Sequence, residues 1–232
     1  MSGAASSDLE AHPSHPLGSN EIRAQLRQGA VTAVHQVNAQ LVAVLCARAA
    51  VGAPGFPFGT ELRARLASLQ GAQREQLACC GTLLVDLGFA DATRWCTVAA
   101  ALEASGMETQ APAEHWLPPD DAVLLAHSTL HVASSVLHAA PSEAGVLLGA
   151  APETAKVIAA MTVHQLSDVA HGRPHWIVPR WCEVPKVWAD LLDFAAGSSV
   201  ARLAVLRCWQ LSGGRAGWLH PYFEARAEPP QT

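Results

Sequence analysis

One pattern occurs twice in this sequence, and the repetition constrains the fold more than any other feature. The matching residues, each pair 92 positions apart, are Leu66/Ile158, Leu69/Met161, Gln73/Gln165, Leu77/Val169 and Ala78/Ala170. Upstream, residues 37–50 parallel residues 127–140 at a spacing of 90. Chance similarity between Ala-rich helices is the alternative. Because both stretches keep their order and spacing, we interpret them as an internal duplication.

The second copy of the pattern begins at Pro152 and reads as two short helices followed by an extended arm. Apolar residues three or four positions apart give each helix one apolar face. Pro152 suits a first helical turn, and the Thr162 hydroxyl can cap the second helix. Gly172 ends that helix, and Pro174 prevents its continuation. The residues from His175 to Trp181 then predict an extended edge or arm.

The rest of the chain predicts further helices joined by short loops. Ser19 or Asn20 can cap a helix that reaches residue 50, with Gly29 as a candidate break. Phe56 and Phe58 are candidate anchors in the Gly/Pro-rich loop that follows. Further helices are expected at 61–69, 72–80, 91–104, 120–138, 141–149, 184–196 and 198–211, with Asp91 and Asp120 or Asp121 as caps and an extended segment at 82–89. The prediction is an all-α fold with short extended arms.

The expected organisation is two repeats with a linker and two loose ends. Residues 1–18 are a disordered tail, 19–105 the first repeat, 106–119 a linker, 120–211 the second repeat with a C-terminal helix, and 212–232 a loose tail. An extended linker of this length spans up to ~45–50 Å. The repeats can therefore pair within one chain, as an intramolecular pseudo-dimer, or swap between chains in a homo-oligomer.

Composition favours a soluble helical core in the cytoplasm. Half of the residues are apolar and 15% are charged, which is too apolar for disorder. The most apolar stretch, residues 37–50, contains Asn38, Gln40 and Arg48, so we expect no membrane span. We also expect no signal peptide. The six cysteines form no C-x-x-C pair, which favours reduced thiols.

Charge is distributed unevenly along the chain. Residues 22–94 contain seven Arg against four acids, whereas residues 103–193 contain eleven acids against four bases. The last 39 residues contain four Arg and two Glu. If the protein contacts nucleic acid, the first repeat and the C-terminal tail are therefore the better candidates. A solvated surface with uneven charge is the alternative.

The repeated pattern resembles the flagellar transcriptional regulator family FlhD. The residues that carry the resemblance in the second copy are Leu148–Gly149, Glu153, Ala155, Ala159–Thr162, Gln165, Ala170 and Trp181. In the first copy they are Val34, Asn38, Leu41, Leu69, Leu77–Ala78, Leu83–Leu84 and Phe89. The resemblance covers roughly two-thirds of the chain.

The resemblance implies a fold and a role. FlhD-type proteins are small, all-α, intertwined dimers that assemble with FlhC-type subunits into a complex that binds promoter DNA and activates transcription. A tandem copy implies that one chain forms its own pseudo-dimer. Two features depart from the family. Val85 and Ile177 stand where the family has a cysteine in its arm, which excludes a disulfide there, and Leu147 stands where the family has a basic residue.

Candidate DNA contacts lie in the first repeat. Its two-helix pattern can be interpreted as a helix-turn-helix, in which Gln73 and Arg74 would face bases. Arg63, Arg65 and Arg74 are the predicted phosphate contacts. Packing of these helices inside the pseudo-dimer is the alternative interpretation.

Candidate partner contacts are aromatic. Trp176, Trp181 and Trp188 lie in or near the extended arm, and we predict exposed rings that anchor a partner protein. Core packing is the alternative role for these three side chains.

No motif predicts an enzyme. The chain lacks G-x-S-x-G, P-loop and G-x-G-x-x-G patterns, and we predict no catalytic residue, no cofactor and no metal. His127, His131 and His138 share a helical face, but their first-repeat counterparts are Val37, Leu41 and Arg48, so we interpret that face as packing.

The sequence therefore predicts a non-enzymatic transcriptional co-regulator of FlhD type. It would bind an FlhC-like subunit and, through it, promoter DNA, with RNA polymerase as a further partner. The alternative is a helical adaptor of a secretion or motility apparatus without DNA contact. A third reading is a competitor that sequesters the FlhC-type subunit.

Overall fold

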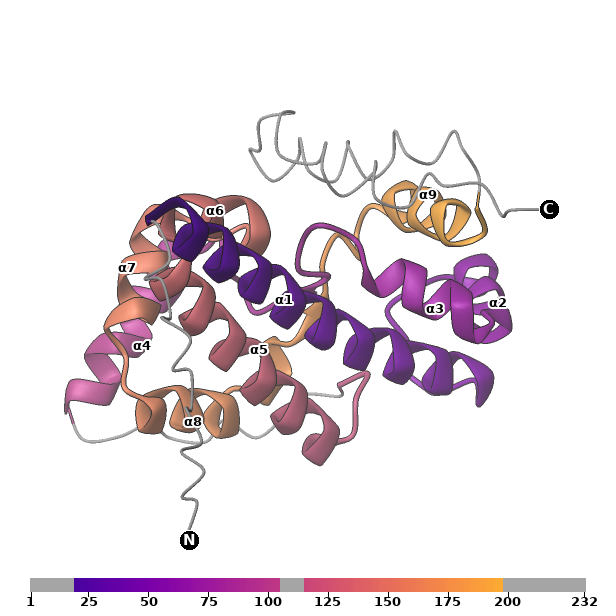
Figure 1. Ribbon diagram of the computed structural model, residues 1–232. Helices are drawn as coiled ribbons and strands as arrows, with labels where there is room; N and C mark the ends of the chain where they lie inside the picture. The colour runs from indigo at the N-terminus through magenta and orange to yellow at the C-terminus, as the bar shows by residue number, and fades with distance from the viewer. Residues whose placement is uncertain (1–18, 105–114, 198–232) are drawn as a thin grey trace, which may run out of the picture.

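The computed structural model describes residues 19–104 and 115–197, and these residues are mostly helical. The two expected tails, the expected helix at 198–211 and most of the expected linker lie outside the described residues. The long helix α1 (Ser19–Ala50) runs beside α5 (Pro119–Ala139), and the shorter elements surround this pair (Figure 1).

Helix α1 supplies one side of the core. Val34, Val37, Leu41 and Leu45 recur three or four positions apart and are completely or almost completely buried. The expected break at Gly29 is wrong, because the helix continues through it. Glycine weakens a helix by roughly 1 kcal/mol but leaves its hydrogen-bond pattern intact.

A succession of two short helices, a short strand and a final helix occurs in both halves of the described chain, and the second half has one further short helix and a 3-10 turn. In the first half they are α2 (Thr60–Ser68), α3 (Gly71–Ala78), β1 (Val85–Asp86) and α4 (Ala92–Ala104). In the second they are α6 (Pro141–Leu148), α7 (Pro152–Ala160), α8 (Val163–Gly172), the 3-10 turn η1 (Pro174–Trp176), β2 (Val178–Pro179) and α9 (Pro185–Ala195). Helices α2 and α7 both begin and end 92 residues apart, and α3 and α8 begin 92 residues apart.

The helix starts are also matched. At α8 the Thr162 hydroxyl accepts a hydrogen bond from the Gln165 N–H, and the Thr162 N–H donates to Gln165 Oε1 at 2.8 Å. At α3 the Gln70 N–H donates to Gln73 Oε1 at 2.9 Å. This reciprocal capping box confirms the prediction that Thr162 caps the second helix.

The two arms meet as a short antiparallel pair. Val85 faces Pro179 and Asp86 faces Val178, so two positions that lie 92 residues apart in the chain are direct neighbours. The pairing is shorter than the extended segments we expect from the sequence. Pro179 has no N–H to donate, which is consistent with its place on a two-stranded edge.

The last helix of each half packs on the other half. Helix α4 lies against α7, whereas α9 lies against α2 and α3 (Figure 1). Each of these helices has a fully buried tryptophan as its fourth residue, Trp95 in α4 and Trp188 in α9. Trp95 Nε1 donates to the Gly88 carbonyl at 3.1 Å, and Trp188 Nε1 donates to the Arg180 carbonyl at 2.8 Å. The two anchoring carbonyls are again 92 residues apart.

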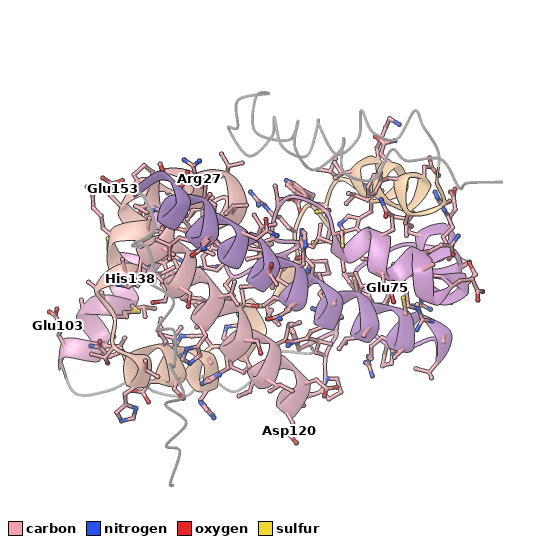
Figure 2. All side chains as sticks on the ribbon, in the orientation of Figure 1. Arg27, Glu75, Glu103, Asp120, His138 and Glu153 are labelled. Atoms are coloured by element: carbon pink, nitrogen blue, oxygen red, sulfur yellow. The ribbon has the colours of Figure 1, made fainter. Side chains whose placement is uncertain are left out.

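The start of α5 differs from the expectation. The helix begins at Pro119, so Asp120 and Asp121 lie in its first turn and do not cap it; Asp120 points outward (Figure 2). Carboxylates in a first turn still favour the helix dipole. Trp116 and Leu117, which the sequence places in the linker, are buried in the core.

The sequence predicts no membrane span, but the two longest helices are apolar over a length that could cross a membrane. Residues Ala24–Ala50 of α1 and all of α5 are long and apolar enough to cross a membrane, by length and composition alone. Core helices of soluble proteins meet the same criterion, and here the two helices pack against each other. Near the start of α1, Arg27 Nε donates to the buried Glu143 carboxylate of α6 at 2.9 Å.

Candidate partner and nucleic-acid surfaces

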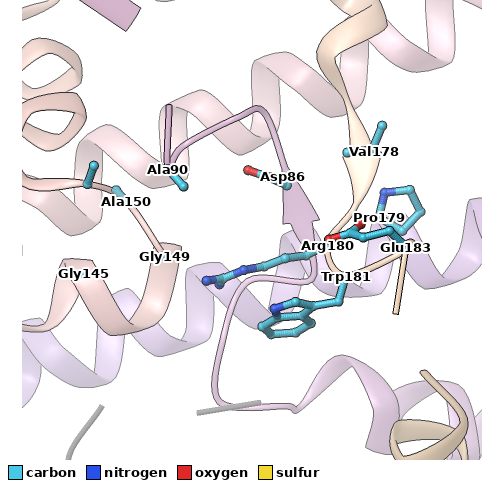
Figure 3. Close-up of a pocket in the computed structure, with 11 residues that line it drawn as sticks. Asp86, Ala90, Gly145, Gly149, Ala150, Val178, Pro179, Arg180, Trp181 and Glu183 are labelled. Carbon is cyan, nitrogen blue, oxygen red and sulfur yellow. The ribbon is translucent and has the colours of Figure 1, made fainter. Parts of the chain in front are cut away.

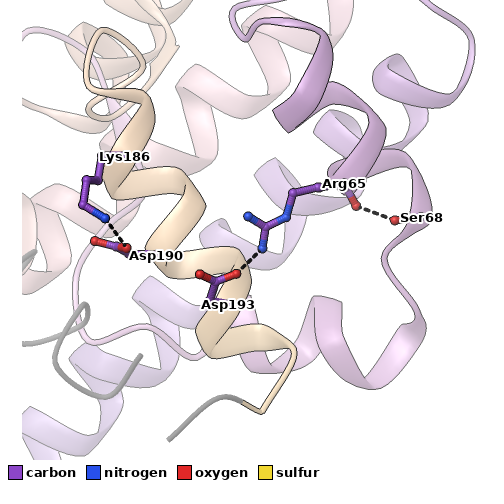
Figure 4. Close-up of polar contacts among 5 residues, drawn as sticks. All are labelled: Arg65, Ser68, Lys186, Asp190 and Asp193. Atoms are coloured by element: carbon purple, nitrogen blue, oxygen red, sulfur yellow. Dashed lines mark hydrogen bonds and ion pairs between the residues drawn. The ribbon is translucent and has the colours of Figure 1, made fainter. Parts of the chain in front are cut away.

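The predicted phosphate contact Arg65 lies on α2 and forms an ion pair with Asp193 of α9 (Figure 4). Nearer the start of α9, Lys186 and Asp190 form a second ion pair at 3.1 Å. The Arg65 pair joins elements 128 residues apart, so its guanidinium helps to hold α9 on the first half and is partly neutralised there. Exposed pairs of this kind contribute roughly 0–1 kcal/mol to stability.

The predicted phosphate contact Arg63 faces the loop before α2. Its Nη2 donates to the Ala53 carbonyl at 3.2 Å, and its guanidinium lies 5.2 Å from the centre of the Phe56 ring. A cation above an aromatic face is attracted by the ring quadrupole. Arg63 therefore braces the loop, and it is only partly exposed.

Arg74 and Gln73 lie in the first two turns of α3. The exposed Arg74 donates from Nε to the Leu69 carbonyl at 3.0 Å. Gln73 uses its side-chain oxygen in the capping box with Gln70. To contact a base through that oxygen, Gln73 would have to release the start of its own helix.

The three predicted tryptophan anchors have different environments. Trp176 is half-buried, with the Arg94 guanidinium 4.7 Å above its ring and Trp95 at its edge. Trp181 is half-buried, with the Arg180 guanidinium 4.5 Å from its ring. The expectation of an exposed Trp188 is wrong, because its ring is completely buried against Phe58. Trp188 lies on the apolar face that α9 turns toward α2 and α3.

A pocket of about 380 Å³ opens between the second arm and the turn that joins α6 to α7 (Figure 3). Its lining residues are Asp86, Ala90, Gly145, Gly149, Ala150, Ala151, Val178, Pro179, Arg180, Trp181 and Glu183. Sequence reasoning missed this pocket because its walls come from three distant segments. Gly149 and Trp181, both noted for the family resemblance, lie on two of its sides.

Gly149 and Arg180 fit each other closely in this pocket. The Arg180 side chain extends from the arm toward Gly149 (Figure 3), and any Cβ at Gly149 would overlap the guanidinium. Gly149 also has a φ of +68°, which glycine adopts without strain. The Asp86 carboxylate on the opposite strand accepts a hydrogen bond from the Phe89 N–H at 3.0 Å.

Three cysteine thiols have pKa values raised by burial, which makes them poor nucleophiles. Burial raises the pKa of Cys46 and Cys80. Burial and the neighbouring Glu183 carboxylate raise the pKa of Cys182 to about 11. A thiol with a raised pKa stays protonated near neutral pH and reacts slowly.

The histidines on α5 form a pair. The His127 and His131 rings lie 4.4 Å apart, and burial, followed by His131 and His171, lowers the pKa of His127. His138 turns instead to the Ser134 carbonyl at 2.7 Å. Within residues 19–104 and 115–197, no three His, Cys, Asp or Glu side chains gather in an arrangement that could hold a metal ion.

No protein-family model, curated protein or solved structure matches this chain.

Proposed function

We propose that this chain is a non-enzymatic, cytoplasmic transcriptional co-regulator of FlhD type, built as an intramolecular pseudo-dimer of two FlhD-like repeats. It binds an FlhC-like subunit and acts through it on promoter DNA, with RNA polymerase as a further partner. The observation that carries the proposal is the crosswise packing of α4 on α7 and of α9 on α2 and α3, around arms that meet at matched positions.

Matched burial supports the duplication. Leu66 and Ile158 are both 0% exposed, and the same holds for Val85 and Ile177. These last two residues stand where the family has its arm cysteine, so packing of apolar side chains replaces a covalent link at the centre of the molecule. Two chains in a family dimer bury such a face against each other, and here one chain buries it alone.

The α2–α3 surface is the proposed route to DNA. Arg74 is exposed there, and Arg63 and Arg65 contribute positive charge although both also have partners within the chain. Contacts of this kind to phosphate strengthen binding in a salt-dependent way and carry little sequence information.

The first test is to recover partners of the tagged full-length chain from its native host by mass spectrometry. Recovery of an FlhC-like subunit or of RNA polymerase supports the proposal. Recovery of secretion or motility structural proteins, with neither of those, overturns it.

The second test concerns the recovered complex. Arg74→Gln should lower the slope of log affinity against log salt by about one, because one phosphate contact is lost. Lys156→Gln, which removes an exposed charge from α7, is the matched control and should leave the slope unchanged. Equal slopes for both variants would remove Arg74 from the DNA surface.

A helical adaptor of a secretion or motility apparatus is the second candidate. It is favoured by the internal use of Arg65 in its pair with Asp193 and of Gln73 in its capping box, since both leave less of the α2–α3 surface for DNA. A third role is that of a competitor, which binds the FlhC-like subunit and blocks its access to DNA. The DNA-binding assay of the recovered complex distinguishes it, because a competitor lowers DNA binding by the FlhC-like subunit.

A further inference from the structure

His127 and His131 lie one turn apart on α5, and their imidazole rings lie against each other. The ring centroids are 4.4 Å apart, with an angle of 51° between the ring planes. Both side chains are half-buried. The residues 90 positions earlier in the chain, Val37 and Leu41, are completely or almost completely buried. The second half of the chain therefore places two partly accessible imidazoles where the first half has core side chains.

The ring nitrogens of this histidine pair are not used by the protein backbone. Two other histidines nearby place Nδ1 at a carbonyl four residues earlier, His138 at Ser134 at 2.7 Å and His171 at Ser167 at 2.8 Å. In the part of the chain that the structure describes, no hydrogen bond joins either ring of the pair to another group. Their nitrogens are therefore available to a ligand that needs electron-pair donors.

The surroundings of the pair favour an imidazole that can donate a lone pair. Burial, followed by His131 and His171, lowers the pKa of His127. A neutral imidazole offers a lone pair on one of its two nitrogens, whereas a protonated one offers none. His127 is therefore neutral near pH 7 and able to coordinate a cation.

The separation of the rings fits a shared metal ion. Two imidazoles bound to one ion at roughly 2.0–2.1 Å, with an angle of about 90–109° at the metal, have ring centroids roughly 4.5–5.3 Å apart. The observed 4.4 Å lies at the short end of this range, so a small opening of the rings brings one nitrogen of each onto the same ion. Two histidines at positions i and i+4 of a helix are also the spacing of helical zinc motifs.

The ligand type selects the class of metal. Imidazole suits zinc, copper and nickel, whereas magnesium and calcium prefer oxygen ligands. No third His, Cys, Asp or Glu joins the pair among residues 19–104 and 115–197, so water would complete the coordination.

We propose that His127 and His131 chelate one divalent ion of the zinc, nickel or copper class across a single turn of α5. Here we depart from the packing role that the sequence favours for this face. The site depends only on the geometry of α5 and its two rings, so it stands or falls separately from the regulator role and from any contact with DNA.

The test uses the untagged, reduced, full-length ¹⁵N-labelled chain, with NiCl₂ as the probe. Ni²⁺ is paramagnetic, so the amide signals of residues 127–131 should broaden saturably as the ion is added. ZnCl₂ should compete for the same site, and MgCl₂ should not. Absence of saturable broadening at residues 127–131 overturns the proposal.

Variants then locate the ligands. His127→Gln and His131→Gln each remove one of the two imidazoles and should weaken the site at least tenfold, and either variant suffices if the other does not fold. His138→Gln is the matched control, because it removes an exposed histidine from the same helix and should leave the affinity unchanged. Unchanged affinity in the first two variants, or an equal loss in the control, shows an adventitious ion only and overturns the assignment.

A second readout uses the stability of the chain. The folded helix holds the two rings together and the unfolded chain does not, so Ni²⁺ should raise the urea concentration at the unfolding midpoint. The rise should be lost in His127→Gln and retained in His138→Gln. A rise of the same size in both variants would place the ion elsewhere in the chain and contradict the proposed site.

Discussion

Asn38 is completely buried in the middle of α1, where the surrounding residues are apolar. Its Nδ2 donates to the Ala78 carbonyl at 3.2 Å and to the Thr82 carbonyl at 2.9 Å, and its Oδ1 accepts from the Leu84 N–H at 2.7 Å. This one side chain therefore provides hydrogen-bond partners for backbone groups at the end of α3 and at the start of the first arm. The sequence marks Asn38 as a polar interruption, but its partners lie 40 to 46 residues away and no local pattern identifies them.

Replacement of Asn38 should therefore be costly. We expect Asn38→Ala to lower the free energy of unfolding by about 3 kcal/mol or more, because buried backbone groups lose their partners. Urea denaturation followed by circular dichroism measures the change. Ser128→Ala, at the position 90 residues later, is half-buried and should cost less than about 1 kcal/mol. Equal losses in the two variants would contradict the role assigned to Asn38.

Gly29 offers a change in the opposite direction. It lies inside α1, is exposed, and has no atom within 4 Å of the position where a Cβ would be placed. Gly29→Ala should raise the free energy of unfolding by roughly 0.5–1 kcal/mol, because alanine loses less conformational freedom in a helix. An unchanged or lower urea midpoint would contradict a continuous α1.

At the scale of elements, local chemistry predicts the helices and not their partners. The sequence places α7 and α8 within one or two residues of their observed bounds, because Pro152, Thr162 and Gly172 are local start and stop signals. It wrongly predicts an exposed Trp188 ring, because the exposure of that ring depends on which helices α9 packs against. The pocket is a further case, because Arg180 and Gly149 meet only after the arms have paired.

The segment before α5 is joined to the second arm by His115, and this contact should respond to pH. Its Nε2 lies 3.0 Å from the Ile177 carbonyl, and its Nδ1 accepts from the Leu117 N–H at 3.2 Å. Burial lowers the pKa of His115, although the hydrogen bond to the Ile177 carbonyl acts to raise it. Burial is also the main cause of the lowered pKa of His127 and His175.

The direction of the pH effect follows from these shifts. A histidine whose folded pKa is lowered binds fewer protons when folded, so stability is lost as pH falls below the ordinary value of about 6.5. We therefore expect the urea concentration at the unfolding midpoint to be lower at pH 5.5 than at pH 7.5. His115→Gln should reduce this difference, whereas His164→Gln, at an exposed position, should not. A midpoint that rises toward pH 5.5 would contradict the prediction.

At the scale of the whole molecule, crosswise packing predicts that neither half is stable alone. Helix α4 needs α7, and the α2–α3 pair needs α9 to cover it. We expect fragments 1–110 and 111–232, expressed separately, to show little cooperative unfolding. Expressed together, they should associate and recover one cooperative transition. Two fragments that each unfold cooperatively in isolation would contradict the interlocked fold.

At this scale the sequence predicts the mostly helical fold best, because apolar spacing and helix caps are local signals. The internal duplication stays a prediction. The surfaces are predicted less well. Arg63 and Arg65 are predicted by charge, but their contacts with Ala53 and Asp193 depend on how the chain folds back on itself.

The crosswise packing of α9 on α2 and α3 also has a consequence for synthesis on the ribosome. Residue 78 completes α3, whereas α9 is complete only at residue 195. At about 5–20 residues per second, the first half emerges roughly 6 to 23 s before its cover. During that interval the apolar side chains that later contact α9 are exposed to solvent and to chaperones. Translation speed across residues 79–195 therefore becomes a determinant of how much of the newly made chain reaches its folded form.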